Sequence, residues 1–281
     1  MPSPCLYRHE TTETLLALRR CVCVVCVAQG CVLSPLLFSL YTNDCTSTHP
    51  AVKLLKVADD TTVIGLIKDG DESAYRQEAE RLELWCGRHN QELNTLKTVE
   101  MIVDFRRHPS PQLPLTLSSC LVLTVETFKF LGITISQDLK WAININSVLK
   151  KAQQRMYFLR LLRKHGLPQE LLRRFYTAVI ESVLCSSITV WLGAAPKKDK
   201  LRLQRTLTTA ERIVCTPLLT LEDLHAARTK TRPCKILSDP PHPGHRLFQL
   251  LPSGRGYQSM QTRTSRHSNS FFPLAINFLN T

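Results

Sequence analysis

The spacing of apolar residues changes near residue 140, and this change most constrains the fold. Before it, short β-branched runs at residues 53–57 and 62–67 are separated by turn residues, which predicts strands. After it, apolar residues recur every three or four positions through residues 145–164, which predicts an amphipathic helix. Strands and helices in separate blocks are typical of the α+β class. We therefore expect an α+β fold.

Two helices and several further strands are expected in the first block. Ser34-Pro35 predicts the start of a helix over residues 33–41, and Asp71 or Ser73 can cap another that runs to about Leu93. The inner face of the second helix is predicted to carry Leu82, Trp85, His89 and Leu93. The further strands are expected at residues 101–105, 115–125 and 128–135.

Three helices are expected in the second block. The helix over residues 145–164 has an apolar stripe and ends near Gly166, which is suited to a C-cap. Pro168 predicts the start of a second helix, with Leu172, Phe175 and Val179 on its inner face. A third is expected over residues 200–214. From Thr216 onward Pro, Ser, Gly and Arg predict loops with one or two short helices.

Two acids lie between the first two predicted strands. Ala58-Asp59-Asp60 has the pattern of a tight hairpin with carboxylates at its tip. Such carboxylates can share divalent cations that activate a hydroxyl and stabilise a leaving pyrophosphate. Adjacent aspartates alone are usually part of a solvated turn, so the prediction depends on the motifs that flank them.

Three motifs flank the hairpin in a specific order. Gln29-Gly30-Cys31-Val32-Leu33-Ser34-Pro35 lies upstream, and Leu93-Asn94-Thr95-Leu96-Lys97-Thr98 and Phe128-Lys129-Phe130-Leu131-Gly132-Ile133 lie downstream. In order and spacing, these segments and the hairpin resemble the later palm motifs of non-LTR (LINE-type) retrotransposon reverse transcriptases. The resemblance extends from Gln29 to near the C-terminus.

The resemblance implies a role for each motif. Asp59 and Asp60 would be catalytic and would bind Mg²⁺, and Lys97 would assist proton transfer to pyrophosphate. Gln29 and Gly30 would accommodate template and incoming nucleotide, and the hairpin that carries Lys129 would grip the primer end. The implied partner is RNA or DNA, with no small-molecule cofactor.

The chain departs from the family pattern in two places. Val57 stands where the family usually has an aromatic residue, and a β-branched residue suits a strand there. The family's first catalytic Asp precedes the Gln-Gly motif, whereas residues 1–43 contain no Asp. Glu10 and Glu13 lack a surrounding strand pattern. We therefore expect an incomplete palm without competent polymerase activity, whose strands lack upstream partners.

Four segments follow from these patterns. Residues 1–28 are unassigned and residues 29–140 form a partial reverse-transcriptase palm. Residues 141–215 form a helical, thumb-like region, and residues 216–281 form a basic, loop-rich C-terminal region.

Charge is divided unevenly along the chain. Residues 1–149 hold 14 Lys/Arg and 16 Asp/Glu, a net charge of −2, whereas residues 150–281 hold 22 and 7, a net charge of +15. Such a block attracts polyanions such as nucleic acid, although a solvated surface without a partner remains an alternative. Helix geometry leaves five cations beside the apolar stripes as candidate nucleic-acid contacts: Lys150, Lys151, Arg155, Arg173 and Arg174.

A second resemblance covers residues 145–191, which are similar to the N-terminal segment of AlkB-homologue tRNA-modifying proteins. That family couples an iron dioxygenase to a methyltransferase. No His in this chain is followed two positions later by an acid, and no Gly-rich turn follows a strand. The shared basic helices predict contact with RNA or DNA and no chemistry.

Composition indicates whether the chain can span a membrane and in which compartment it is expected. The longest purely apolar run, near residues 21–28, is shorter than the ~20 residues that a membrane span needs. Eleven cysteines show no framework spacing, so we expect reduced thiols and an intracellular protein of the cytoplasm or nucleus. Two other functions stay open: a polymerase completed by an acid from another chain, and a host-adopted RNA-binding module. The oligomeric state is not predicted.

Overall fold

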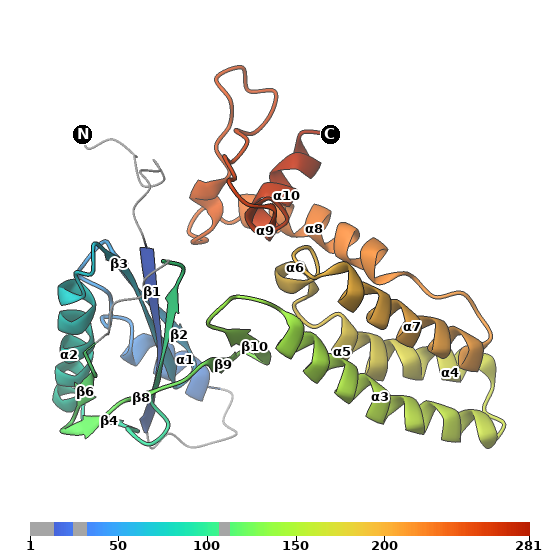
Figure 1. The fold of residues 1–281 in the computed structure, drawn as a ribbon, viewed down its shortest axis with the longest axis horizontal. Coiled ribbons are helices and arrows are strands. Elements are labelled where there is room, and N and C mark those ends of the chain that lie inside the picture. Colours follow the sequence, from blue (N-terminus) through green and yellow to red (C-terminus); the bar gives the residue numbers. More distant parts are fainter. Residues whose placement is uncertain (1–13, 25–32, 107–112) are drawn as a thin grey trace. The chain divides into compact units, whose positions relative to one another are not determined.

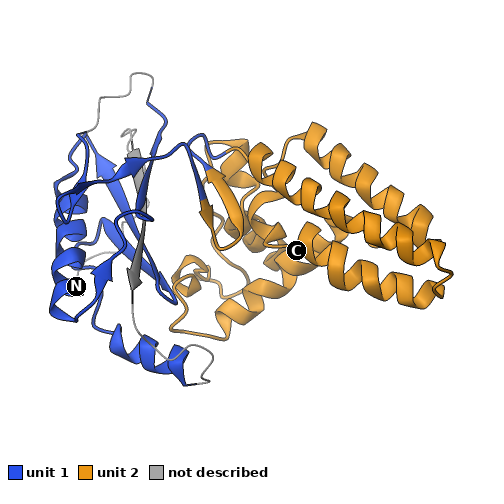
Figure 2. Cartoon of the chain, turned by 90° about the horizontal axis from the view of Figure 1, so that it is seen from below, with its two compact units in different colours: residues 1–128, 136–139 blue, residues 129–135, 140–281 orange. Residues whose placement is uncertain are grey.

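A computed structural model of the chain describes residues 14–24, 33–106 and 113–281. The chain divides into two compact units (Figure 2). Unit 1 comprises residues 1–128 and 136–139, and unit 2 comprises residues 129–135 and 140–281. Strands dominate unit 1 and helices dominate unit 2, so the predicted α+β class is confirmed.

Unit 1 is built on a six-stranded sheet with the order β2-β3-β1-β5-β8, in which β4 also pairs with β1 (Figure 1). The predicted hairpin is confirmed, because β2 and β3 pair antiparallel from Val52 opposite Gly65 to Val57 opposite Asp60. The strands are β1 (Thr14–Val24), β2 (Val52–Val57), β3 (Asp60–Lys68), β4 (Glu92–Leu93), β5 (Val99–Asp104) and β8 (Leu123–Thr124).

The central strand, β1, falls in the segment that the sequence left unassigned. It pairs antiparallel with β3 on one side and with β5 on the other. The expectation that the palm strands lack upstream partners was therefore wrong, since β1 joins the hairpin to the rest of the sheet. Its sequence, TLLALRRCVCV, lacks the regular apolar–polar alternation by which strands are recognised.

Helix α2 (Ser73–Arg88) packs on the sheet, and its inner face forms a large part of the unit 1 core. Leu82 and Trp85 are buried as predicted and pack with β-strand residues such as Val63. The helix is shorter than expected, because Asn90 adopts a left-handed backbone (φ 51°) and Leu93 belongs to β4. Helix α1 (Ser34–Tyr41) is confirmed. Four of its large apolar side chains are exposed, namely Leu36, Leu37, Leu40 and Tyr41, and the fifth, Phe38, is half-buried.

Two small hairpins lie after β5 along the chain. The single strand expected over residues 115–125 is instead β6 (Thr116–Leu117), β7 (Cys120–Leu121) and β8, because Ser118 and Ser119 turn with positive φ. The strands expected over residues 128–135 are β9 (Thr127–Phe130) and β10 (Ile133–Ser136). Leu131 and Gly132 both have positive φ between them, as a type I′ hairpin turn requires.

Unit 2 is a bundle of helices around one large apolar cluster. Helix α3 packs mainly on α7, and the predicted stripe of α3 is buried from Val148 to Leu159. Gly166 has the predicted C-cap geometry, with φ 74°. The helices are α3 (Ala142–Lys164), α4 (Gln169–Phe175), η1 (Tyr176–Glu181), α5 (Ser182–Leu184), α6 (Ile188–Trp191), α7 (Lys197–Val214), α8 (Leu221–Leu237), η2 (His245–Leu247), α9 (Ser265–Ser268) and α10 (Phe271–Leu279).

The second predicted helix of unit 2 contains a π-helical segment. η1 is π-helical and continues directly from α4 into α5. The buried stripe is Leu172, Tyr176, Ile180 and Leu184, whereas Phe175 and Val179, expected inside, are only half-buried. The inner face therefore repeats every four residues rather than alternating threes and fours.

The C-terminal segment contains more regular structure than expected. Helix α8 has 17 residues, although the sequence predicted only short helices after Thr216. Thr220 caps it, since the hydroxyl oxygen accepts a hydrogen bond from the backbone N–H of Asp223 at 3.1 Å. A small apolar cluster joins α8 to α10: Ile236, Phe248, Ala275 and Ile276. Among the described residues, no helix is long and apolar enough to cross a membrane.

Gly65 tests the packing of α2 on the sheet. A Cβ added there would lie 2.6 Å from Tyr75 Cδ2 and 2.9 Å from Tyr75 Cβ, which the helix backbone holds in place. We predict that G65A destabilises the chain by about 1–3 kcal/mol. Urea unfolding followed by far-UV circular dichroism measures the change.

The matched control is G87A, since a Cβ at Gly87 meets nothing within 4 Å. Gly87 lies in α2, so alanine there should be neutral or stabilise by up to about 1 kcal/mol. Equal stabilities for G65A and G87A would contradict this packing.

Candidate functional site

The hairpin between β2 and β3 presents the two predicted aspartates. Val57 pairs with Asp60, so only Ala58 and Asp59 form the turn. Ala58 has a left-handed backbone (φ 52°), which favours such a tight turn. Asp59 is exposed at the tip, and Asp60 is half-buried as the first residue of β3. The two carboxylates, which are adjacent in sequence, thus both lie at the turn end of the hairpin.

Strand β1 lies directly beside Asp60. The register places Val22 opposite Asp60 and Cys21 opposite Thr61. Thr14, at the start of β1, pairs with Lys68 at the opposite end of β3. None of the eleven residues of β1 is an acid. The cross-strand position nearest Asp60, where a third carboxylate could lie, is therefore occupied by a valine.

The residues at this hairpin do not fit a two-cation Mg²⁺ centre. Mg²⁺ requires a near-octahedral set of oxygen ligands, and two-metal sites hold their ions about 3.5–4 Å apart between several shared oxygens. Asp59 and Asp60 supply only two carboxylates, and the strand register pairs Asp60 with Val22. Across the described side chains, no group of three or more His, Cys, Asp or Glu is arranged to hold a metal ion.

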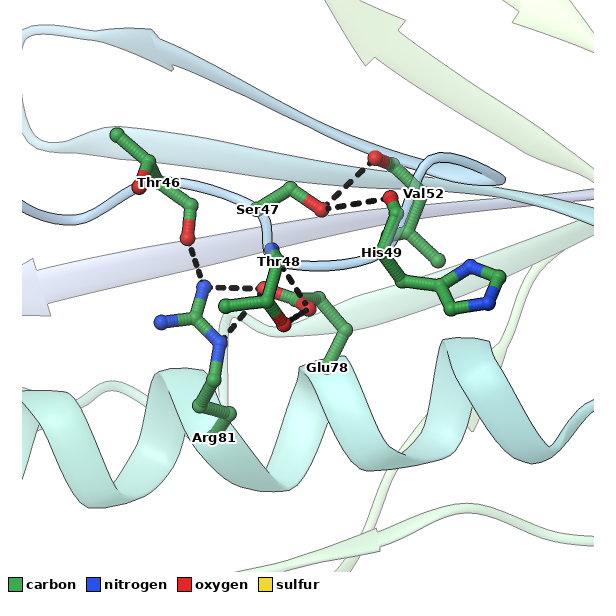
Figure 3. Close-up of polar contacts among 7 residues, drawn as sticks. All are labelled: Thr46, Ser47, Thr48, His49, Val52, Glu78 and Arg81. Atoms are coloured by element: carbon green, nitrogen blue, oxygen red, sulfur yellow. Dashed lines mark hydrogen bonds and ion pairs between the residues drawn. The ribbon is translucent and has the colours of Figure 1, made fainter. Parts of the chain in front are cut away.

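A buried carboxylate on α2 anchors the loop that leads into β2 (Figure 3). Glu78 is 2% exposed and accepts hydrogen bonds from the Thr48 hydroxyl at 2.9 Å and from the Thr48 backbone N–H at 3.3 Å. Arg81 Nε donates to Glu78 Oε1 at 2.8 Å, and Arg81 Nη2 donates to the Thr46 carbonyl. Ser47 Oγ donates to the carbonyl of Val52 at 2.8 Å. These bonds position β2, and with it the aspartate turn.

The charge of Glu78 depends on this network. Burial by itself raises the pKa of Glu78, but the hydrogen bonds from Arg81 and Thr48 outweigh it, so the pKa lies below its ordinary value. Glu78 is therefore a carboxylate at neutral pH. Its hydrogen bonds are charge-assisted and stronger than those between neutral groups.

Further contacts tie α1 to the hairpin and to α2. Lys56 Nζ donates to the carbonyl of Thr42, and Tyr41 Oη donates to the carbonyl of His89. The His89 ring stacks on Trp85 at 4.2 Å, and His89 Nε2 lies 3.4 Å from Asp44 Oδ2. The end of α1 is thereby held next to both the hairpin and the end of α2.

The other predicted palm residues are not assembled around the aspartates by any contact that the structure records. Gln29 and Gly30 lie outside the described residues. Lys97 is exposed in the turn after β4, where its backbone N–H donates to Asn94 Oδ1 at 3.1 Å. Lys129 is exposed on β9. The roles that the resemblance implies for these residues stay predictions.

The predicted nucleic-acid contacts of unit 2 differ in availability. Lys150 and Lys151 on α3 and Arg173 on α4 are exposed. Arg174 is exposed as well and lies 3.1 Å from Glu170, an ion pair at a solvated surface. Arg155 is half-buried, and its Nη1 donates to the carbonyl of Val179 at 2.6 Å. Part of the Arg155 guanidinium is therefore used to hold α3 against η1.

Sequence reasoning missed the Glu78 network and β1. The spacing Glu78-x-x-Arg81 suits an ion pair on one helix, but nothing in it indicates a loop thirty residues upstream. For β1, a local signal lies in the run of Cys and Val from residue 21, which suits a strand but does not indicate its partners.

Comparison with known proteins confirms both resemblances. The sequence pattern of the reverse transcriptase family (RNA-dependent DNA polymerase) matches residues 5–135. The pattern of the N-terminal region of alkylated DNA repair protein alkB homolog 8 matches residues 141–182. The first match includes β1 and the hairpin, and the second includes α3 and α4.

One similar protein aligns with most of this chain. It is a probable RNA-directed DNA polymerase from transposon BS of Drosophila melanogaster, 28% identical over 189 residues. The match covers 63% of this chain and 21% of the relative, so the chain spans about a fifth of that protein's length. The chain thus contains a reverse-transcriptase-family segment related to a transposon polymerase.

Glu78→Gln tests the loop anchor. Because the folded pKa of Glu78 is depressed, its contribution to stability is complete above the unfolded pKa of about 4.3 and is lost as the pH falls through the folded value. We predict that E78Q weakens α2 and its contacts by about 1–3 kcal/mol at pH 7. The difference from the unaltered chain should shrink as the pH falls below about 4. Hydrogen exchange of residues 73–88, corrected for intrinsic rates, measures it.

Glu80→Gln is the matched control, since Glu80 lies on the same helix and is exposed. Hydrogen exchange of residues 73–88 in E80Q should match that of the unaltered chain at every pH. A constant difference between E78Q and the unaltered chain from pH 7 to pH 3 would refute the anchor.

Proposed function

From the reverse-transcriptase match of residues 5–135 we infer that this chain is a retroelement-derived nucleic-acid-binding protein that does not polymerise DNA by itself. One observation carries the proposal. Strand β1, which lies beside the aspartate hairpin, has no acid, and Val22 occupies the position opposite Asp60.

The chemistry explains why one missing carboxylate matters. Two cations close together repel one another, and shared carboxylates must offset both that repulsion and the loss of water ligands. With only Asp59 and Asp60, the hairpin offers too few oxygens to hold the ions in fixed positions. Loss of an essential catalytic group commonly lowers turnover by several orders of magnitude.

The nucleic-acid part of the proposal depends on unit 2. Residues 150–281 carry a net charge of +15, and Lys150, Lys151, Arg173 and Arg174 present exposed cations on α3 and α4. Such side chains contact backbone phosphates and carry no sequence information directly. The proposed binding is therefore electrostatic and largely independent of base identity.

The AlkB-homologue match adds no chemistry to the proposal. Residues 141–182 are helical from Ala142 onward apart from the turn near Gly166, and their exposed cations suit phosphate contact. We assign this segment to nucleic-acid binding.

Primer extension tests the catalytic part. We predict that the purified chain adds no nucleotides to a primed RNA or DNA template in the presence of Mg²⁺. Asp59→Ala should change nothing, since the hairpin does not support turnover. Template-directed incorporation that disappears in D59A would overturn the proposal.

Salt-dependent binding tests the nucleic-acid part. Affinity for single-stranded RNA or DNA should fall steeply with salt, with a log–log slope of about −0.7 for each phosphate contacted. The charge reversals K150E/K151E and R173E/R174E should each weaken binding, as measured by fluorescence anisotropy. The control K53E/K68E reverses two exposed lysines of unit 1 and should bind as the unaltered chain does. Equal effects of all three pairs would place binding elsewhere.

A further inference from the structure

A groove of about 670 Å³ lies within unit 2, between α8 and the segment that leads into α6. Its lining comes from Ser187, Ile188 and Thr189 on one side and from α8 and the residues after it on the other. The lining residues of α8 and its C-terminal extension are Ala227, Arg228, Thr231, Arg232, Lys235, Ile236, Asp239 and His242.

Three cations of α8 follow the groove in one row. Arg228, Arg232 and Lys235 are exposed and recur at spacings of four and three residues, so they lie on one face of the helix. At a rise of about 1.5 Å per residue, the row from Arg228 to Lys235 is about 10 Å long. Asp239 is the one acid of the lining, and it lies beyond the last of the three cations.

The opposite wall of the groove is a strained turn. Ser187 has a left-handed backbone (φ 49°, ψ 34°), a conformation that non-glycine residues seldom adopt. The turn follows η1 and α5, and π-helical segments of this kind are frequent at functional sites. Such strain is retained where the surrounding structure holds it in place.

One of the three cations provides that support. Arg228 Nη1 donates to the carbonyl of Cys185 at 2.6 Å, which fixes the chain just before Ser187. Arg228 also interacts electrostatically with Glu181. Burial raises the pKa of Glu181, and the positive charge of Arg228 offsets part of that rise. Arg228 is therefore a fixed structural residue, whereas Arg232 and Lys235 are free to serve a ligand at the surface.

We propose that the α6–α8 groove binds the phosphodiester backbone of a single-stranded nucleic acid, with Arg232 and Lys235 as the main contacts. The proposal deepens the proposed function and rests on it. It places a binding site outside the α3 and α4 cations, on a helix that lies beyond both matched segments.

The spacing of the two available cations suits neighbouring phosphates of a strand. Arg232 and Lys235 are three residues apart, about 4.5 Å along the axis of α8, and successive phosphates of a stacked strand are about 3.4 Å apart. Arg232 can bind a phosphate through two N–H groups at once, and Lys235 adds a point charge next to it. Apolar Ile188 and Ile236 form part of the lining beside these cations.

The experiment compares charge reversals in the full-length chain. The variant R232E/K235E is matched with K197E/K198E, which reverses two exposed lysines in the first turn of α7, outside the groove. Acids are favourable at a helix N-terminus, so the control should fold as the unaltered chain does. Binding of fluorescein-labelled 12-mers of oligo(dT) and oligo(U) is measured by anisotropy over a salt series, with circular dichroism as the check on folding.

We expect R232E/K235E to weaken binding at least tenfold and to reduce the salt slope by about 0.7–1.4, the loss of one or two phosphates. The control should change affinity less than threefold. The neutral variant R232Q/K235Q should give an intermediate loss, which separates lost contacts from repulsion.

Each other outcome overturns the groove assignment. If both reversals weaken binding equally, only the overall charge matters, and the proposed function survives without the groove. If R232E/K235E binds normally, the strand lies elsewhere. If polyglutamate or inorganic phosphate competes as well as an oligonucleotide at equal charge, the groove is a general anion site. If the unaltered chain binds no oligonucleotide, the proposed function fails together with the groove.

Discussion

The antiparallel pairing of β1 with β3 determines most of what unit 1 can be. It runs from Thr14 opposite Lys68 to Val22 opposite Asp60, and β1 pairs on its other edge with β5. Without β1, the hairpin that carries the aspartates would have an open edge, and open edges favour pairing with other chains. The same pairing brings an acid-free strand next to Asp60. The pairing that covers the open edge of the hairpin is therefore also the one that places Val22 opposite Asp60.

Unit 1 and unit 2 differ in how they are stabilised and in what they present at the surface. In unit 1, the buried Glu78 holds a loop, and α2 packs on the sheet through Tyr75 and Leu82. In unit 2, apolar stripes build a helical core and leave rows of cations at the surface, of which Arg232 and Lys235 are an example. The proposed binding of a polyanion by unit 2 does not depend on a metal centre in unit 1, because phosphate contacts need cations.

Features that depend on neighbouring residues could be predicted from the sequence. The turn at Ala58-Asp59 and the stripe from Val148 to Leu159 follow from local periodicity and turn chemistry, and both are confirmed. Helix α8 also had a local signal, since Thr220 precedes Asp223 by three residues as in a helix cap, but Pro233 and the polar composition hid it. Gly166 likewise marked the end of α3 correctly.

Features that depend on distant residues could not be predicted in this way. Strand β1 owes its place to partners some forty to ninety residues away, and its own sequence shows no alternation. Glu78 becomes a loop anchor only when Thr48 folds back onto α2. The α6–α8 groove needs the left-handed Ser187, which no local residue preference indicates. These features arise from tertiary contacts between distant residues, which local sequence patterns do not specify.

Mn²⁺ binding, followed by electron paramagnetic resonance, tests most directly whether the strand beside Asp60 limits the site. We predict that the unaltered chain binds Mn²⁺ weakly and without dependence on Asp59. We expect V22D, which adds a carboxylate opposite Asp60, to tighten binding at least tenfold, and V22D/D59N to lose this gain. Tight, Asp59-dependent binding by the unaltered chain would show that the strand beside Asp60 does not limit the site, as would a V22D variant that folds normally and binds no better.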